Sequence, residues 1–152
     1  MSLRSTALAA LLALSSAAQA GTYQSHPLAE QARRAQVIVQ ASLDAPLTRD
    51  EDGQTWTVYP LRVSRTLAGD PASLPQLDGR PALYILAGLD DAPTFKAGDQ
   101  AVLLLYQGKL DNPLVGYTQG VFRIQDGRLP DADNATPDAF WQRLAGLREG
   151  GQ

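Results

Sequence analysis

The hydrophobic positions after residue 35 fall into short runs typical of β-strands, some of them apolar on both faces and others alternating with a period of two. The clearest case is the segment in which Tyr59, Leu61 and Val63 occupy alternate positions, because successive side chains of a strand point to opposite faces. Segments rich in Gly, Pro and Asp, such as the polar turn at residues 48–54, separate the runs. The pattern predicts five strands, at residues 36–43, 55–67, 82–89, 100–110 and 114–124.

The middle of the chain offers no helix between these strands, which favours an antiparallel sheet over a parallel α/β fold. Pro60 lacks the N–H that a ladder needs, so its strand is expected at a sheet edge or with a bulge. Gly116 and Gly120 interrupt the last strand and suit a strongly curled sheet. We therefore expect a mainly β fold, a five-stranded antiparallel barrel that is closed or nearly closed.

Two helices are expected, one on each side of the strand region, over residues 27–35 and 137–148. The second has the stronger signal, because Thr136 can accept hydrogen bonds as its cap. Phe140 and Leu144 then begin an apolar stripe with helical spacing. This helix should pack its stripe against the barrel.

The first 20 residues have the three-part pattern of a signal peptide. Arg4 supplies the positive charge, residues 7–14 form an unbroken apolar run, and Ala18 and Ala20 provide the small residues of a cleavage site. The alternative, a membrane anchor, would need about 20 predominantly apolar residues. We expect cleavage after Ala20, a single domain over residues 21–152, no membrane-spanning segment after cleavage, and a periplasmic or secreted location.

Composition narrows the chemistry. The chain is 44% hydrophobic and 19% charged, as in a folded domain. It has no Cys and one His, which excludes disulfides, Cys-bound zinc and a thiol nucleophile. The net charge of −3 and the scattered basic residues argue against nucleic-acid binding. No cofactor is expected.

Individual polar motifs point to structural roles. His26 lies in what we expect to be a loose, solvated arm, without the partners that a metal site needs. The acidic segments 50–53 and 131–134 lack the later ligands of a calcium loop, so we interpret them as turns. Ser64 and Ser73 occur outside a nucleophile-elbow motif. Metal-binding and nucleophilic catalysis are therefore not expected.

A spaced pattern of apolar and turn residues resembles that of small exported bacterial proteins. It comprises Thr55, Thr57, Tyr59, Leu61, Val63, Leu67, Gly69, Phe95, Gly98, Asp99, residues 102–105, Gln119, Gly120, Phe122 and Ile124. Those proteins in turn resemble the OB-type barrel of tissue inhibitors of metalloproteinases and netrin modules, and the similarity spans about residues 36–124. It implies an OB-like barrel. The inhibitory mechanism does not carry over, because those inhibitors use an amino-terminal Cys and the cleaved chain would begin with Gly21.

Trp56 and Arg62 are the candidate partner-binding residues, on the outward face of the predicted second strand. Aromatic and Arg side chains are enriched at binding hot spots. The alternative is that Trp56 covers the barrel under the carboxy-terminal helix. We expect a non-enzymatic binding protein that engages a protein partner, such as an exported protease or an envelope component. The competing hypothesis is a small hydrolase or carbohydrate-active enzyme that uses two carboxylates.

Overall fold

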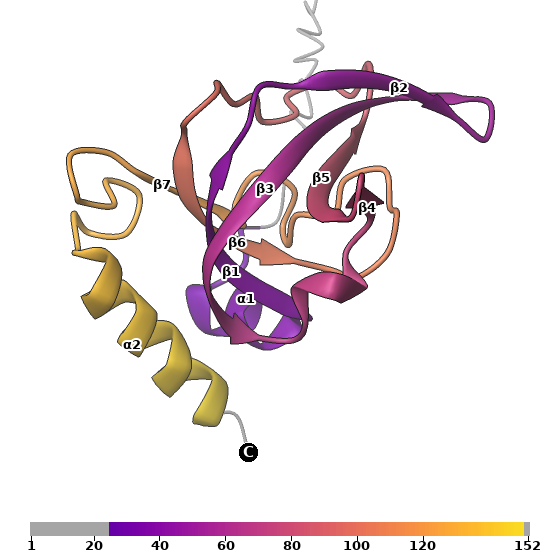
Figure 1. The fold of residues 1–152 in the computed structure, drawn as a ribbon. Coiled ribbons are helices and arrows are strands. Elements are labelled where there is room, and N and C mark those ends of the chain that lie inside the picture. Colours follow the sequence, from indigo (N-terminus) through magenta and orange to yellow (C-terminus); the bar gives the residue numbers. More distant parts are fainter. Residues whose placement is uncertain (1–24, 151–152) are drawn as a thin grey trace, which may run out of the picture.

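A computed structural model describes residues 25–150 of the chain, and they form a mainly β structure with two α-helices (Figure 1). The elements in chain order are α1 (Leu28–Arg34), β1 (Val37–Leu43), β2 (Leu47–Glu51), β3 (Gln54–Ala68), the 3₁₀ turn η1 (Pro71–Ser73), β4 (Gln76–Leu77), β5 (Arg80–Leu86), β6 (Gln100–Leu105), β7 (Val121–Ile124) and α2 (Pro137–Glu149). The predicted signal peptide lies outside the described residues. Within them, no helix is long and apolar enough to cross a membrane.

The strands form one antiparallel sheet in the order β4-β5-β3-β1-β6-β7, with β2 paired to β3 beside β1. The five predicted strands correspond to β1, β3, β5, β6 and β7. Because the sheet has seven strands and its order does not close, the five-stranded closed barrel is not confirmed. The last two predicted strands are also shorter than expected, since the chain turns back after β6 and Leu105 bridges to Leu114.

Two strands are additional to the five predicted: the two-residue β4, and β2, which lies in the segment predicted as a polar turn. Its residues are almost all exposed, so no alternation of apolar side chains reveals it in the sequence. The turn itself is confined to Asp52 and Gly53, which both have positive φ, at 53° and 76°. This is the backbone that two-residue hairpin turns require. The β2–β3 hairpin extends well beyond the body of the sheet in Figure 1.

Pro60 lies inside β3, which is a central strand. Of the two expectations for this strand, a sheet edge or a bulge, the sheet edge is therefore wrong. The residues of β3 before it pair with β2, and those from Leu61 onward pair with β1. Pro60 thus occupies the junction between the two pairing regions, where its carbonyl still accepts from the Asp44 N–H at 2.9 Å. The missing ladder donor is tolerated at this break.

The concave face of the curled sheet holds the larger hydrophobic cluster. Strands β1, β3, β5, β6 and β7 contribute to it, and loop residues Leu74, Phe95 and Leu114 complete it. Tyr59 and Phe95 meet edge to face, with ring centroids 5.1 Å apart. A single interior lined by five strands explains how a short chain without disulfides buries enough apolar surface to fold.

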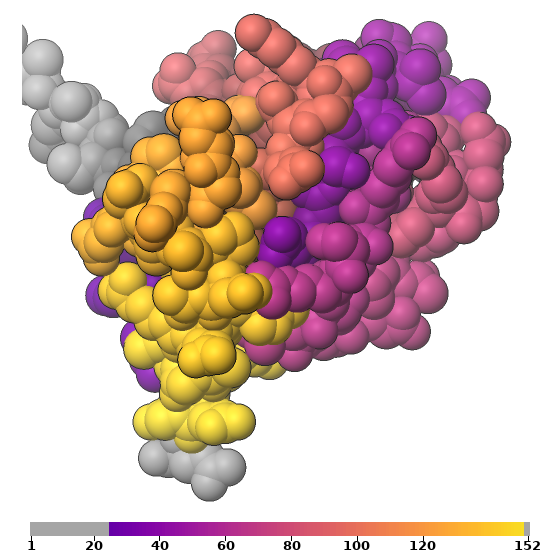
Figure 2. Space-filling model, turned by 60° about the vertical axis from the view of Figure 1, so that its left-hand side comes forward, coloured from indigo at the N-terminus to yellow at the C-terminus, as the bar shows by residue number. Residues whose placement is uncertain are grey.

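Both helices cover one part of the opposite, outer face. The Thr136 hydroxyl accepts from the Ala139 N–H and caps α2, as predicted. Phe140 is fully buried and its ring lies 4.7 Å from that of Phe122. Figure 2 shows α2, in yellow, lying directly against the magenta part of β3. The helices thus cover one end of the outer face, a second group of buried side chains from β3, β4 and β5 lies at the other end, and the part between them, at Arg62, is exposed.

Candidate functional site

The open part of the outer face carries a cluster of two arginines around one carboxylate. Asp44 follows β1 and accepts from Arg62 Nε on β3 at 3.1 Å and from Arg80 Nη2 on β5 at 2.8 Å. The hydrogen bond from Arg80 holds the pKa of Asp44 below its usual value, and the charge of Arg62 acts in the same direction. The side chain of Arg62 is 68% exposed. The cluster therefore carries one net positive charge on an accessible surface.

A shallow polar groove lies next to this cluster, toward α2. Its volume is about 190 Å³, and it is lined by Gln40, Ala41, Ser42, Arg62, Ser64 and Gln100. Ser64 Oγ donates to the backbone carbonyl of Gln40 at 3.0 Å, and Arg65 Nε donates to the Gln40 side chain at 2.8 Å. Strands β1, β3 and β6 form the floor, so the lining side chains stand on a rigid surface.

Beyond the arginine cluster, in the direction of the β2–β3 hairpin, the outer face carries an aromatic cluster. Trp56 is only 3% exposed and meets Tyr84 edge to face, with ring centroids 6.1 Å apart. Lys109 Nζ lies 5.0 Å from the centroid of Trp56 and 4.9 Å from that of Tyr84. The same ammonium forms an ion pair with Glu51. The lysine thus covers two aromatic rings while neutralising a carboxylate.

The charged groups of this aromatic cluster change one another's pKa. The hydrogen bond from Lys109 holds the pKa of Glu51 below its usual value. Burial, with a further contribution from the charge of Glu51, raises the pKa of the Tyr84 hydroxyl, which donates to Glu51 at 3.4 Å. The indole nitrogen of Trp56 is buried without a hydrogen-bond partner. Buried donors in native proteins are nearly always paired, so this nitrogen needs an explanation.

The two predicted residues share a face of β3 but differ in exposure. Arg62 is six positions after Trp56, which corresponds to about 20 Å along a strand. Arg62 is available to a partner, whereas Trp56 is covered. The alternative position for Trp56, under the carboxy-terminal helix, is wrong, because α2 packs on the separate cluster that contains Phe122.

Four residues that complete these clusters escaped the sequence reasoning: Asp44, Glu51, Arg80 and Lys109. Asp44 directly follows β1 and Arg80 begins β5, positions where charged residues are ordinary, and nothing in their local sequence indicates that they converge. Lys109 is 53 positions from Trp56 and comes from a segment predicted as strand. It arrives there because the segment after β6 meets the end of β5, where the Leu86 N–H donates to the Asp111 carbonyl at 2.8 Å, although β5 and β6 are not neighbours in the sheet.

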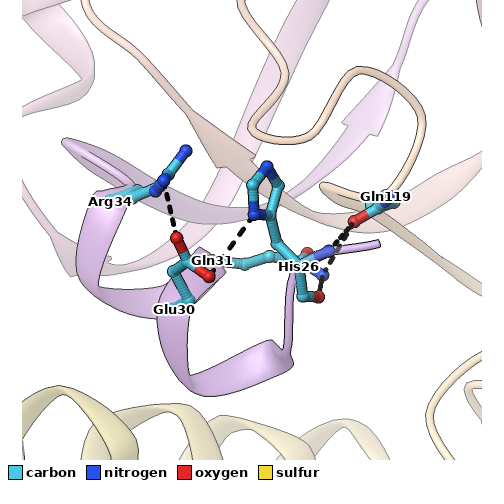
Figure 3. Close-up of polar contacts among 5 residues, drawn as sticks. All are labelled: His26, Glu30, Gln31, Arg34 and Gln119. Carbon is cyan, nitrogen blue, oxygen red and sulfur yellow. Dashed lines mark hydrogen bonds and ion pairs between the residues drawn. The ribbon is translucent and has the colours of Figure 1, made fainter. Parts of the chain in front are cut away.

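His26 is held in place, which corrects the prediction of a solvated arm at this residue (Figure 3). Its backbone N–H donates to Gln119 Oε1 at 3.0 Å, and its carbonyl accepts from Gln31 Nε2 at 2.7 Å. Its imidazole lies 3.4 Å from Glu30, which also pairs with Arg34. These contacts fasten α1 to the turn before β7, which is a structural role.

The acidic segment 131–134 is a turn, as interpreted, whereas in segment 50–53 only Asp52 and Gly53 form the turn and Asp50 and Glu51 belong to β2. Asp50 accepts from the Thr55 hydroxyl at 2.7 Å, and Asp133 pairs with Arg143 at 3.3 Å. Asp133 and Asn134 both have positive φ. Among residues 25–150, no three His, Cys, Asp or Glu side chains lie close enough together to hold a metal ion.

A scan against protein-family models finds no match, and a search of curated proteins finds none either.

Proposed function

We propose that this chain is an exported, non-enzymatic binding protein that engages a protein partner through the outer face of its sheet. The observation that carries the proposal is the exposed Arg62 beside Arg80, with a single carboxylate, Asp44, shared between them. Export rests on the predicted signal peptide at residues 1–20. The OB-type resemblance remains part of the proposal, and the one interior cluster lined by five strands supports it.

The chemistry of the arginine cluster selects an acidic partner surface. A guanidinium has five N–H donors in a planar fork, and Asp44 uses only part of this capacity on each arginine. The unused donors suit bidentate pairing with a carboxylate from a partner. The two arginines stand on β3 and β5, which are paired strands, so their backbones are already fixed before binding. Binding therefore costs less conformational entropy than it would at a loop.

The competing carboxylate hydrolase finds less support in the same region. A two-carboxylate mechanism needs one acid whose pKa is raised, so that it can donate a proton at neutral pH. Asp44 and Glu51, the carboxylates of the outer face, both have a lowered pKa because cations bind them. They are therefore suited to holding arginine and lysine side chains in place.

The test is affinity capture from periplasmic and secreted extract with the signal-free protein, followed by a binding titration with the recovered protein. Arg62→Glu should weaken binding at least tenfold, because it reverses the charge presented to an acidic surface. The matched control is Arg128→Glu, at an exposed arginine in the turn after β7, which should leave the affinity unchanged. Equal affinities for the two variants, or efficient turnover in a hydrolase screen, would overturn the proposal.

A further inference from the structure

The segment at residues 107–112, here called the strap, crosses the end of β5 without forming a helix or strand. Its carbonyl at Asp111 accepts from the Leu86 N–H at 2.8 Å, and its first N–H donates to the side chain of Gln36 at 2.7 Å. Its remaining attachment to the sheet is the ammonium of Lys109. The Asn112 side chain bonds only within the following loop, accepting from the Leu114 N–H at 3.0 Å and donating to the Tyr117 carbonyl at 3.4 Å. A segment held by so few bonds is expected to open without unfolding the sheet.

Under the strap lies a site built from Trp56, Tyr84 and Glu51, here called the aromatic site. An ammonium lies within about 5 Å of two ring centroids in this site and also pairs with a carboxylate. Proteins recognise alkylammonium groups by these features. In this structure the recognised group is the chain's own Lys109. The occupant shows which ligand chemistry the site accepts.

The closed arrangement leaves one polar group unsatisfied. The indole N–H of Trp56 is buried and has no acceptor among the atoms around it. An unpaired buried donor costs free energy in this arrangement.

We propose that the aromatic site is a lysine-binding site that Lys109 occupies in the free protein, and that a lysine side chain of a protein partner replaces Lys109 when the strap moves aside. Glu51 and the electron-rich ring faces require a cation, and the seated side chain is itself a lysine. This contact goes beyond the function proposed for Arg62, since it has the opposite charge preference and lies about 20 Å away along β3. Either proposal can fail without the other.

Self-occupancy has a quantitative consequence. When the binding-competent state is only a fraction of the population, the apparent affinity of a ligand falls by that fraction. Removing the Lys109 side chain should therefore increase the affinity for an added lysine. The probe is Nα-acetyl-lysine amide, whose side-chain ammonium is free. The control is Nα-acetyl-norleucine amide, which has a similar aliphatic chain and no charge.

The measurement is a titration followed by the indole N–H resonance of Trp56, assigned with a Trp141→Phe variant because the chain has two tryptophans. In Lys109→Ala the lysine amide should shift this resonance and bind about tenfold more tightly than in the unaltered protein. The norleucine amide should cause no saturable shift. Adding Glu51→Gln should abolish the gain. Equal affinity in Lys109→Ala and the unaltered protein, or equal binding of both amides, would overturn the proposal.

A second measurement needs no substitution and applies even if Lys109→Ala fails to fold. The Leu86 amide, bonded to the strap, should exchange its hydrogen at least a hundredfold faster than the Leu104 amide in β6. Saturating lysine amide should make it faster still, because the strap then stays open, and an unchanged rate would contradict the proposal. Exchange of Leu86 only at the rate of global unfolding would show that the strap does not open, and would refute the mechanism.

Discussion

The unpaired indole nitrogen of Trp56 makes a quantitative prediction about stability. Replacing Trp56 by benzothienylalanine keeps the shape and the aromatic faces but substitutes sulfur for the N–H group. An unsatisfied buried donor costs about 1–3 kcal/mol. Because Trp56 is only 3% exposed, the folded state bears this cost nearly in full, so the replacement should raise the free energy of unfolding by about that amount.

Urea unfolding followed by far-ultraviolet circular dichroism measures this free energy, and the slope against urea should not change. The same replacement at Trp141 is the control, because the Trp141 nitrogen is not among the buried unpaired atoms of residues 25–150. There we expect less than about 0.5 kcal/mol. An unchanged or lower stability for the Trp56 replacement would mean that the N–H is satisfied in solution.

Three further predictions concern the fold and its charges. Phe140→Ala should lower the free energy of unfolding by about 3–5 kcal/mol, since the ring is fully buried under α2; Phe140→Leu should cost much less, and equal losses would contradict this packing. Asp44 and Glu51 have a lowered pKa when folded, so their contribution to stability is complete above their unfolded values of 3.8 and 4.5 and is lost as the pH falls through the lower folded values. Urea titrations at several pH values should therefore show that the free energy of unfolding falls less steeply at acid pH when Asp44→Asn and Glu51→Gln are combined. The same fall as in the unaltered protein would refute the lowered pKa values. Gly69→Ala should destabilise strongly in thermal melts, because the new Cβ would lie 2.1 Å from the Gln36 carbonyl oxygen at a φ of 70°. Gly79→Ala, with a similar φ and open space around the new Cβ, should cost clearly less. Equal losses would show that backbone strain alone decides both.

The fold was predictable where local patterning and burial agree. The interior positions of β3, such as Tyr59 and Leu61, alternate because one face is buried in the main cluster. The capped start of α2 at Thr136 was equally clear. In contrast, β2 has no buried stripe, and its pairing with β3 depends on a two-residue turn, so its sequence has the composition of a loop.

The site was less predictable because it depends on contacts between distant segments. Alternation correctly placed Trp56 and Arg62 on the face of β3 opposite the main core, but alternation carries no information on what covers that face. Lys109 reaches Trp56 from a loop that contacts the end of β5, although β5 and β6 are not neighbours in the sheet. Asp44, Arg62 and Arg80 meet because β1, β3 and β5 are neighbours in the sheet order.

The central claim is that a protein partner binds on the outer face beside Arg62. Site-specific photocrosslinking in the cells that produce the protein tests it most directly, with benzoylphenylalanine in place of Ser64, in the polar groove, or of Gln142, on the exposed side of α2. We predict a discrete adduct from position 64 that disappears with Arg62→Glu, and none from position 142. An adduct from position 142 alone, or one from position 64 that persists with Arg62→Glu, would contradict the claim.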